Sequence, residues 1–467
     1  LKDGHDVTVV TYREGDAPYF EDDKGVKVYR VDNYMINPNN FIDWVMQLNF
    51  NMVAKVNEII QEQGNFDVIH AHDWLVAYSA KTLKNSYNIP IVSTIHATES
   101  GRNSGIHDEQ QRYINDTEWM LTYESAEVIV NSNYMKNELQ RLFGLPYEKI
   151  NVIPNGVNLN LFNGVERDYN FRRKYAMDNE KIILFMGRLV YEKGIQHLIS
   201  AMPKILEGYK DSKLVICGKG GMQEELAEQV KAMGIENKVY FAGYMNGKDV
   251  QRMYKAADVA VFPSTYEPFG IVALEAMLSE KPIVVSDIGG LNEIVDHKVN
   301  GMKAYCGNPN SIADSILELL YDHKLCQEIT KKAKNKVRNE YNHIFSKIFE
   351  NLNFDNYRWD IVEDEIYDLD GENYLDKESY SNREFKKIIE DEIYYPVFAN
   401  IQIYRTQEKR EDIQTYEDFI RSKCQLILLI TDNEFVDIYT KNKTWLNTIY
   451  QNAINNDFVD IQYIEES

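Results

Sequence analysis

The chain has 467 residues, of which 44% are hydrophobic and 27% charged, and its formal net charge is −22. This length predicts two or three domains. The composition is typical of a soluble globular protein and disfavours long disordered segments. The negative charge disfavours a nucleic-acid or anionic-membrane partner, because such surfaces bind faces rich in Lys and Arg.

The four cysteines are scattered along the chain and form no CxxC pair; they are Cys217, Cys306, Cys326 and Cys424. They indicate neither a disulfide framework nor a zinc site, so we expect a reducing, cytoplasmic location. No run reaches the roughly 18 apolar residues that a membrane-spanning helix needs. We therefore expect no membrane span.

The first residues read as a helix end, a turn through Gly4 and an apolar strand. A Rossmann-like domain normally opens with an earlier strand and a Gly-rich loop, so we expect both to lie upstream of the first residue. From Val7 to about Ile153, short β-branched runs alternate with helical periodicity, which is clearest over 41–63. Strands are expected at Val7–Val10, Val26–Val31, Val68–His70, Ile91–Ile95, Val128–Asn131 and Val152–Ile153.

A second run of the same kind spans Ile182 to about Tyr341. Strands are expected at Ile182–Met186, Lys213–Cys217, Val239–Ala242, Val259–Phe262 and Ile283–Ser286. Alternating strands and helices imply parallel sheets that are covered on both faces. We therefore predict an α/β fold with two Rossmann-like domains, 1–165 and 166–342, and a ligand cleft between them.

Residues 343–467 have a different character, with 27 acidic and 13 basic residues. Strand-like runs lie at Val397–Tyr404, Leu426–Thr431 and Val436–Tyr439. We expect a separate small α+β domain here. The alternative, a helical extension of the second domain, fits only His343 to about Leu352.

The segment Phe262–Met277 follows a buried strand and enters a helix. Pro268 suits the first helical turn. The next three residues, Phe269, Gly270 and Ile271, are then expected to present free N–H groups, which favour an anion.

Two glutamates flank this helix start. Glu267 precedes it in the loop, and Glu275 is expected about two turns into the helix, where it could accept hydrogen bonds from a ribose diol. The alternative is a capped helix with two solvated glutamates, which the strand–loop–helix context disfavours.

Two further strands end in glycine-containing turns. Gly187 allows a tight turn, and Arg188 and Lys193 project from the loop that follows it. Two cations at this place suit a diphosphate leaving group, although a solvated pair is the alternative. Gly218 and Gly220 would let a nucleotide approach another strand end, which is weak evidence without its neighbours.

Histidines follow two strands of the first domain. His70, His72 and Asp73 end one strand, and His96 ends the next. Strand carboxyl ends face the cleft in such folds, so we expect His96 to contact a sugar and His72 and Asp73 to lie on the acceptor side. A structural role is the alternative, favoured for His70 and His72. The spacing does not match a facial metal triad, so we infer no metal.

Together these residues resemble family 4 of the glycosyltransferases, the retaining GT-B enzymes that include glycogen-synthase-like proteins. Over 1–342 the resemblance is carried by E-P-F-G-I-V-A-L-E at 267–275, G-R-L-V-Y-E-K-G at 187–194 and P-N-G-V at 154–157. The H-A-H-D-W and T-I-H segments also resemble those of α-glucan synthases.

The resemblance implies a role for each matching residue. It implies that Arg188 and Lys193 grip the donor diphosphate, that Glu267 contacts the transferred sugar, and that Glu275 binds the ribose. His96 is implied to lie near the sugar. The implied reaction retains the anomeric configuration without a metal or cofactor, by front-face attack in which the departing phosphate helps to deprotonate the acceptor.

The sequence departs from the family at both ends. The Gly-rich loop is absent upstream, and the match fades near Tyr341, where the family's last helices would return to the first domain. The tail is instead similar to a small bacterial protein family of unknown function. Its matching segments are Tyr394-Tyr-Pro-Val-Phe-Ala-Asn-Ile, Thr415-Tyr-Glu-Asp-Phe and Cys424-Gln-Leu-Ile-Leu-Leu.

We therefore expect a glucosyltransferase that extends an α-glucan or another glycan from ADP-glucose or UDP-glucose. A different sugar or a lipid-linked acceptor is the alternative within the same class. A nucleotide-sugar-binding fusion protein with impaired catalysis is the alternative from another class.

Overall fold

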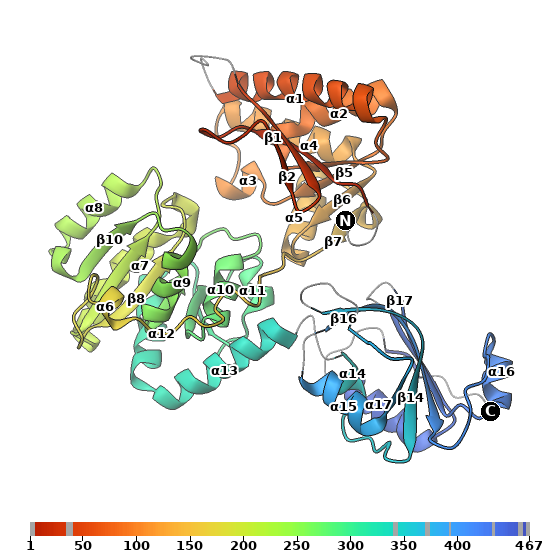
Figure 1. Ribbon diagram of the computed structural model, residues 1–467. Helices are drawn as coiled ribbons and strands as arrows, with labels where there is room; N and C mark the ends of the chain where they lie inside the picture. The colour runs from red at the N-terminus through yellow and green to blue at the C-terminus, as the bar shows by residue number, and fades with distance from the viewer. Residues whose placement is uncertain are drawn as a thin grey trace. The chain divides into compact units, whose positions relative to one another are not determined.

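The computed structural model describes residues 5–33, 41–339, 344–368, 374–391, 394–431, 435–455 and 461–463. The chain forms two compact units, Leu1–Lys334 and Asn335–Ser467, which are drawn in Figure 1. The expected turn through Gly4 lies outside the described residues. Within them, no helix combines the length and the apolar character needed to cross a membrane.

The first half of the larger unit has two small sheets. Strands β1 (Thr8–Tyr12), β2 (Phe20–Asp23) and β3 (Val26–Val31) form one sheet, in the order β1-β3-β2. Strands β4 (Ile69–His72), β5 (Ile91–Ile95), β6 (Glu127–Val130) and β7 (Ile150–Val152) form the other, all parallel and in chain order. Its helices are α1 (Phe41–Gln63), η1 (Trp74–Val76), α2 (Ala77–Tyr87), α3 (Glu99–Arg102), α4 (Glu109–Glu124), α5 (Asn133–Phe143) and η2 (Tyr147–Lys149).

Strand β2 was not predicted. It pairs antiparallel with β3 through a turn at Lys24 and Gly25, whose φ angles are 53° and 94°. Positive φ at both central residues is the geometry of the tight hairpin turns that match strand twist. The run FEDD is too polar to read as a strand, and all four of its residues are exposed.

The second half contains one six-stranded parallel sheet in the order β10-β9-β8-β11-β12-β13. Its strands are β8 (Lys181–Met186), β9 (Ser212–Cys217), β10 (Val239–Gly243), β11 (Val259–Phe262), β12 (Ile283–Ser286) and β13 (Met302–Ala304). Every residue of β11 and β12 is buried, as expected for central parallel strands covered on both faces. The predicted α/β fold with two Rossmann-like halves is therefore confirmed.

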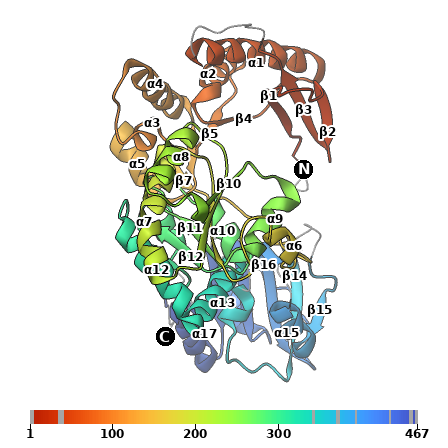
Figure 2. The ribbon, with the colours of Figure 1, turned by 90° about the vertical axis from the view of Figure 1, so that its left-hand side faces the viewer.

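Helices cover both faces of this sheet (Figure 2). The helices of this half are α6 (Tyr169–Arg172), η3 (Tyr191–Lys193), α7 (Ile195–Gly208), α8 (Gln223–Ala232), η4 (Glu236–Lys238), α9 (Gly247–Ala256), α10 (Ile271–Leu278), α11 (Leu291–Ile294), α12 (Pro309–Tyr321) and α13 (His323–Asn339). Helices α7 and α12 pack against each other and share one large core with the strands. Asn308 caps α12, its side chain accepting the N–H of Ser311, and Pro309 occupies the first turn.

The order of this sheet has a consequence for binding. From β8 the chain proceeds outward through β9 to β10, and from β11 it proceeds outward on the other side through β12 to β13. The boundary between β8 and β11 is therefore a topological switch point. In open α/β sheets, ligands bind outside the carboxyl ends of the strands at such a point.

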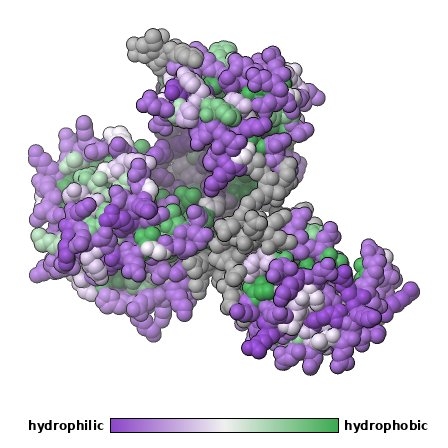
Figure 3. Space-filling view, viewed as in Figure 1, coloured by the Kyte–Doolittle hydropathy of each residue, from purple (hydrophilic) through white to green (hydrophobic). Residues whose placement is uncertain are grey.

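The smaller unit is an antiparallel sheet in the order β15-β14-β16-β17-β18, so the predicted α+β tail is confirmed. Its strands are β14 (Tyr357–Asp368), β15 (Ser379–Ser381), β16 (Tyr394–Arg405), β17 (Leu426–Thr431) and β18 (Phe435–Thr440), and its helices are α14 (Ile344–Ile348), α15 (Asn382–Asp391), α16 (Tyr416–Arg421) and α17 (Lys443–Asn455). The surface of this unit that faces the viewer in Figure 3 is mostly hydrophilic. His343, where the alternative extension would begin, lies outside the described residues.

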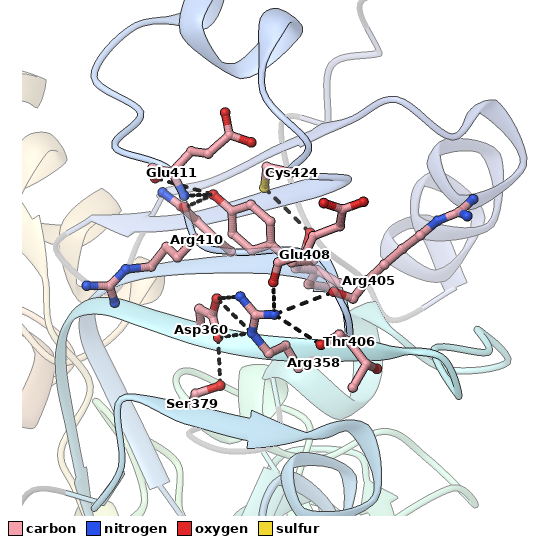
Figure 4. A network of polar contacts seen from close by, with 12 residues as sticks. Arg358, Asp360, Ser379, Arg405, Thr406, Glu408, Arg410, Glu411 and Cys424 are labelled. Carbon is pink, nitrogen blue, oxygen red and sulfur yellow. Dashed lines mark hydrogen bonds and ion pairs between the residues drawn. The ribbon is translucent and has the colours of Figure 1, made fainter.

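An ion pair between a half-buried arginine and a buried aspartate holds a loop against the sheet of the smaller unit (Figure 4). Arg358 binds Asp360 at 2.7 Å, and Ser379 donates to the same carboxylate at 2.7 Å. The guanidinium also donates to the backbone oxygens of Thr406 and Glu408. This cluster anchors the loop after β16, so it is a structural feature of the tail.

Candidate active site

The loops that follow β8 and β11 meet at the switch point. Lys193 Nζ lies 2.7 Å from Glu267 Oε2, and their side chains are 21% and 9% exposed. Ser264 Oγ donates to the same carboxylate oxygen at 3.1 Å. The structure thus joins two predicted site residues that are 74 positions apart, and a charge-assisted hydrogen bond fixes the geometry of the pair.

Close backbone contacts hold these loops together. The N–H of Thr265 donates to Glu192 O at 2.8 Å. Gly194 has φ 68°, and a side chain there would overlap the carbonyl of Pro263. The N–H of Gly290 donates to Glu267 O at 2.9 Å, so the loop after β12 holds the backbone of Glu267.

Gly218 and Gly220 lie very close to protein backbone. A Cβ atom at Gly218 would overlap Gly187 O, and one at Gly220 would overlap Leu189 O. Both glycines are therefore required for packing the loop after β9 against the loop after β8. A nucleotide contact at these two glycines stays a prediction.

Arg188 does not share the Lys193–Glu267 contact. It pairs with Glu192 at 3.3 Å, and its side chain is 66% exposed. A single exposed ion pair of this kind contributes little to stability. Arg188 is consequently available to bind an anionic ligand.

The helix start predicted around Pro268 lies further along the chain. Helix α10 begins at Ile271, with Gly270 as its cap in the left-handed region at φ 105°. Phe269 and Gly270 therefore precede the helix, and of the three predicted N–H groups only that of Ile271 lies in its first turn. Pro268, which we expect near that turn, lies three residues before it, and its carbonyl accepts from Ser132 Oγ at 2.6 Å.

Glu275 lies in the second turn of α10 and is half-buried. The buried hydroxyl of Tyr254 donates to Glu275 Oε2 at 3.1 Å. Burial raises the pKa of Glu275, although the hydrogen bond from Tyr254 acts in the opposite direction. One carboxylate oxygen thus accepts from α9, and a ribose contact of Glu275 stays a prediction.

The structure brings the other predicted residues together at the carboxyl ends of β4 and β5. His72 Nδ1 lies 3.1 Å from His96 Nε2, and the two rings stack with their planes 11° apart. Asp73 Oδ1 accepts the backbone N–H of His96 at 2.8 Å. Asp73 has φ 56° and ψ 177°, a conformation that is strained for any residue but glycine and that clusters at functional sites.

His70 stacks on His72, and its Nε2 lies 2.8 Å from Thr94 Oγ1. Burial lowers the pKa of His70, and His96 lowers it further. Burial also lowers the pKa of His72, and the neighbouring His70 and His96 lower it further. These two imidazoles are therefore neutral at pH 7 and can act as hydrogen-bond partners without carrying charge.

The sequence offered no signal for several residues of the site. Ser264 and Tyr254 act through single hydroxyl groups, and Glu293 accepts the backbone N–H groups of Asn133 and Tyr134 at 3.0 and 2.7 Å. Such contacts join segments far apart in the chain. The pair Gly289-Gly290 is a pattern from which the contact of this loop with Glu267 could have been found, since two glycines after a strand predict a close backbone approach.

Within the described ranges, no group of three or more His, Cys, Asp or Glu side chains has the arrangement of a metal site. Metal independence stays a prediction.

Comparisons with known proteins agree with this architecture. Residues 1–161 match the family described as Glycosyltransferase Family 4, and residues 167–336 match Glycosyl transferases group 1. Residues 333–467 match a protein family of unknown function, DUF2691. The resemblance predicted for the tail is thereby confirmed.

Individual relatives cover most of the larger unit. An uncharacterized glycosyltransferase of Methanocaldococcus jannaschii is 43% identical over 347 residues, which is 73% of this chain and 87% of that protein. A glycogen synthase of Mycobacterium tuberculosis is 34% identical over 276 residues, 59% of this chain and 65% of the synthase.

A solved structure has the same fold. The Anabaena protein HepE, crystallised with UDP and glucose, superposes with a TM-score of 0.56 at 25% identity, over 67% of this chain and 82% of HepE. Together with the α/β sheets and the paired loops at the switch point, these similarities show that the chain belongs to the GT-B glycosyltransferases of family 4. A domain of unknown function follows the transferase domains along the chain.

Proposed function

We propose that the larger unit transfers glucose from a nucleotide-sugar donor to an α-glucan or a related glycan, with retention of the anomeric configuration. The observation that carries this proposal is the Lys193–Glu267 pair at the switch point between β8 and β11. The position is where an open α/β sheet binds its ligand. The pair combines a cation for a diphosphate with a carboxylate for a sugar.

Lys193 has three N–H donors, of which Glu267 takes one. The others are directed to the donor diphosphate, and the exposed Arg188 adds a second cation. Together they neutralise the charge that develops on the leaving phosphate as the glycosidic bond to the donor breaks. This neutralisation is strongest in the transition state, so it accelerates the reaction as well as binding the donor.

Glu267 orients the sugar and stabilises positive charge at its anomeric carbon. Lys193 and Ser264 both bind its Oε2 atom, so we assign Oε1 to the sugar. His96 contacts the sugar from the first domain, with His72 and Asp73 holding it in place. The acceptor hydroxyl attacks the anomeric carbon on the face from which the phosphate departs, so the configuration is retained. The departing phosphate takes the proton of the hydroxyl. No metal takes part in this proposed reaction.

The choice of donor and acceptor follows from the similarities. The similar HepE structure holds UDP and glucose, and the 34% identical relative is a glycogen synthase. We therefore propose UDP-glucose or ADP-glucose as the donor, an α-glucan as the acceptor and the cytoplasm as the location. No cofactor takes part.

The test is a nucleotide-release assay of the full chain with UDP-, ADP- and GDP-glucose, each with glycogen or a maltooligosaccharide. We expect acceptor-dependent release from UDP- or ADP-glucose and an α-linked product in the proton NMR spectrum. A β-linked product would contradict retention. Donor-induced thermal stabilisation without release from any donor would favour a binding protein instead.

A further inference from the structure

Three buried side chains from distant segments form a closed hydrogen-bond network. The hydroxyl of Tyr266 donates to Glu138 Oε1 at 2.8 Å and accepts the backbone N–H of Thr98 at 3.2 Å. The hydroxyl of Thr98 donates to the same Glu138 oxygen at 2.6 Å. Each of the three residues therefore contacts the other two.

The buried polar groups of the network depend on one another for their hydrogen bonds. Thr98, Glu138 and Tyr266 are 0%, 4% and 5% exposed, and a buried polar group that loses its partner is strongly disfavoured. Burial, and secondarily the carboxylate of Glu138, raises the pKa of Tyr266, so its hydroxyl stays protonated and can donate. The Tyr266 ring packs directly against Gly101, since a Cβ atom at that glycine would overlap the ring.

The network lies between two residues to which we assign roles in the reaction. Thr98 follows His96 by two positions, and Tyr266 directly precedes Glu267. A second link runs beside it, from Ser132 at the start of α5 to the carbonyl of Pro268 on the far side of Glu267. The loop that carries Glu267 is thus held by the first half of the unit through residues on both sides of the glutamate.

We infer that Tyr266, Glu138 and Thr98 are positioning residues for sugar transfer, which hold the His96 and Glu267 loops at a fixed separation. This inference rests on the proposed function. Both hydroxyl groups are bonded within the network, and the carboxyl group of Glu138 is buried and accepts from both of them. They therefore act on the reaction only through the two loops.

A positioning role differs from a purely structural one in its kinetic signature. Misplacing a reacting group by about 1 Å can reduce the rate about a hundredfold without weakening ground-state binding. Lys193, Arg188 and Glu275, which we assign to the donor, make their side-chain hydrogen bonds to Glu267, Glu192 and Tyr254, which are not members of the network. Its loss should consequently lower kcat while leaving donor affinity nearly unchanged.

The test is Tyr266→Phe in the full chain, which removes one hydroxyl and keeps the ring in its seat. We expect kcat to fall about ten- to a hundredfold, with the dissociation constant of the donor within about threefold of the wild-type value. Tyr321→Phe is the matched control, since its hydroxyl donates to Gly208 O at another place in the same unit, and it should leave both values unchanged. Unchanged kcat in Tyr266→Phe, or an equal loss of affinity and rate, would overturn the inference.

A second readout is independent of turnover. Hydrogen exchange of the backbone amides in residues 96–102 should accelerate at least about tenfold in Tyr266→Phe, because the N–H of Thr98 loses its acceptor. Gly101→Ala, which displaces the ring, should have the same effect. If the wild type shows no transferase activity, the proposed function fails, while the exchange rates still decide whether the network holds the loop. Unchanged exchange in both variants would reject it.

Discussion

The two ends of the proposed site are built in different ways. The donor end lies among loops that touch through their backbones, as the contacts of Gly194, Gly218 and Gly290 show. The first-domain end is built from side chains, with His72 and Asp73 both bonded to His96. The difference predicts that added atoms at these three glycines destabilise the donor end, whereas the histidine end responds to pH.

The largest effect is expected where chemistry is assigned at the donor end. Glu267→Gln keeps the shape of the side chain but removes its negative charge, which we propose stabilises positive charge on the sugar. We expect kcat to fall about 10²- to 10³-fold, together with about 2 kcal/mol less stability, because Lys193 loses its charged partner. Steady-state kinetics check the rate, and a loss of less than about fivefold would remove Glu267 from its assigned role.

The backbone contacts of the donor end predict a large loss of stability. Gly218→Ala forces a Cβ atom onto Gly187 O at φ 150°, so we expect about 3 kcal/mol less stability. Gly221→Ala is the matched control, because nothing lies within 4 Å of its Cβ position, and it should change stability by less than about 0.5 kcal/mol. Chemical denaturation measures both, and equal losses would refute the packing argument.

The tail offers a comparison outside the transferase unit. Asp360→Asn weakens the ion pair with Arg358, and we expect about 2 kcal/mol less stability of the smaller unit. The exposed Asp355→Asn should have no measurable effect. Transferase activity should be unchanged in both variants. A loss of activity in Asp360→Asn alone would show that the tail takes part in the reaction.

The smallest effect concerns pH at the histidine end. The pKa values of His70 and His72 are lowered in the folded state, so the unfolded chain binds more protons once the pH falls below about 6.5. Stability should decrease as the pH falls through that value, level off below the lowered pKa, and be insensitive to these groups above about pH 7. The double variant His70→Asn/His72→Asn should show a smaller decrease between pH 7 and 5 in thermal denaturation. The exposed His323→Asn should behave like the wild type.

The sequence was most informative where residues are buried and local patterns are strong. The strands Ile91–Ile95, Val259–Phe262 and Ile283–Ser286 were predicted with their observed bounds, since central parallel strands are continuous runs of β-branched residues. Strand β14 was missed because it is rich in acidic residues. Register shifts between Ile361 and Glu363 and between Glu365 and Ile366 also interrupt its alternation.

The site was predictable only in part. Lys193 and Glu267 could each be placed after the end of a strand, because motif spacing fixes their positions relative to the strands, but only the structure shows that these two strands are neighbours. The contact between Glu138 and Tyr266 joins residues 128 positions apart. No local pattern indicates such a contact, since each partner alone resembles an ordinary helix or loop residue.

The central claim is that Lys193 and Glu267 mark the donor site. Calorimetric titration of UDP-glucose and ADP-glucose into the wild type and Lys193→Met tests it most directly. We predict that the wild type binds one of the two donors and that the variant binds it at least about tenfold more weakly, because one charge-assisted contact to the diphosphate is lost. Equal affinity in the two proteins would contradict the account.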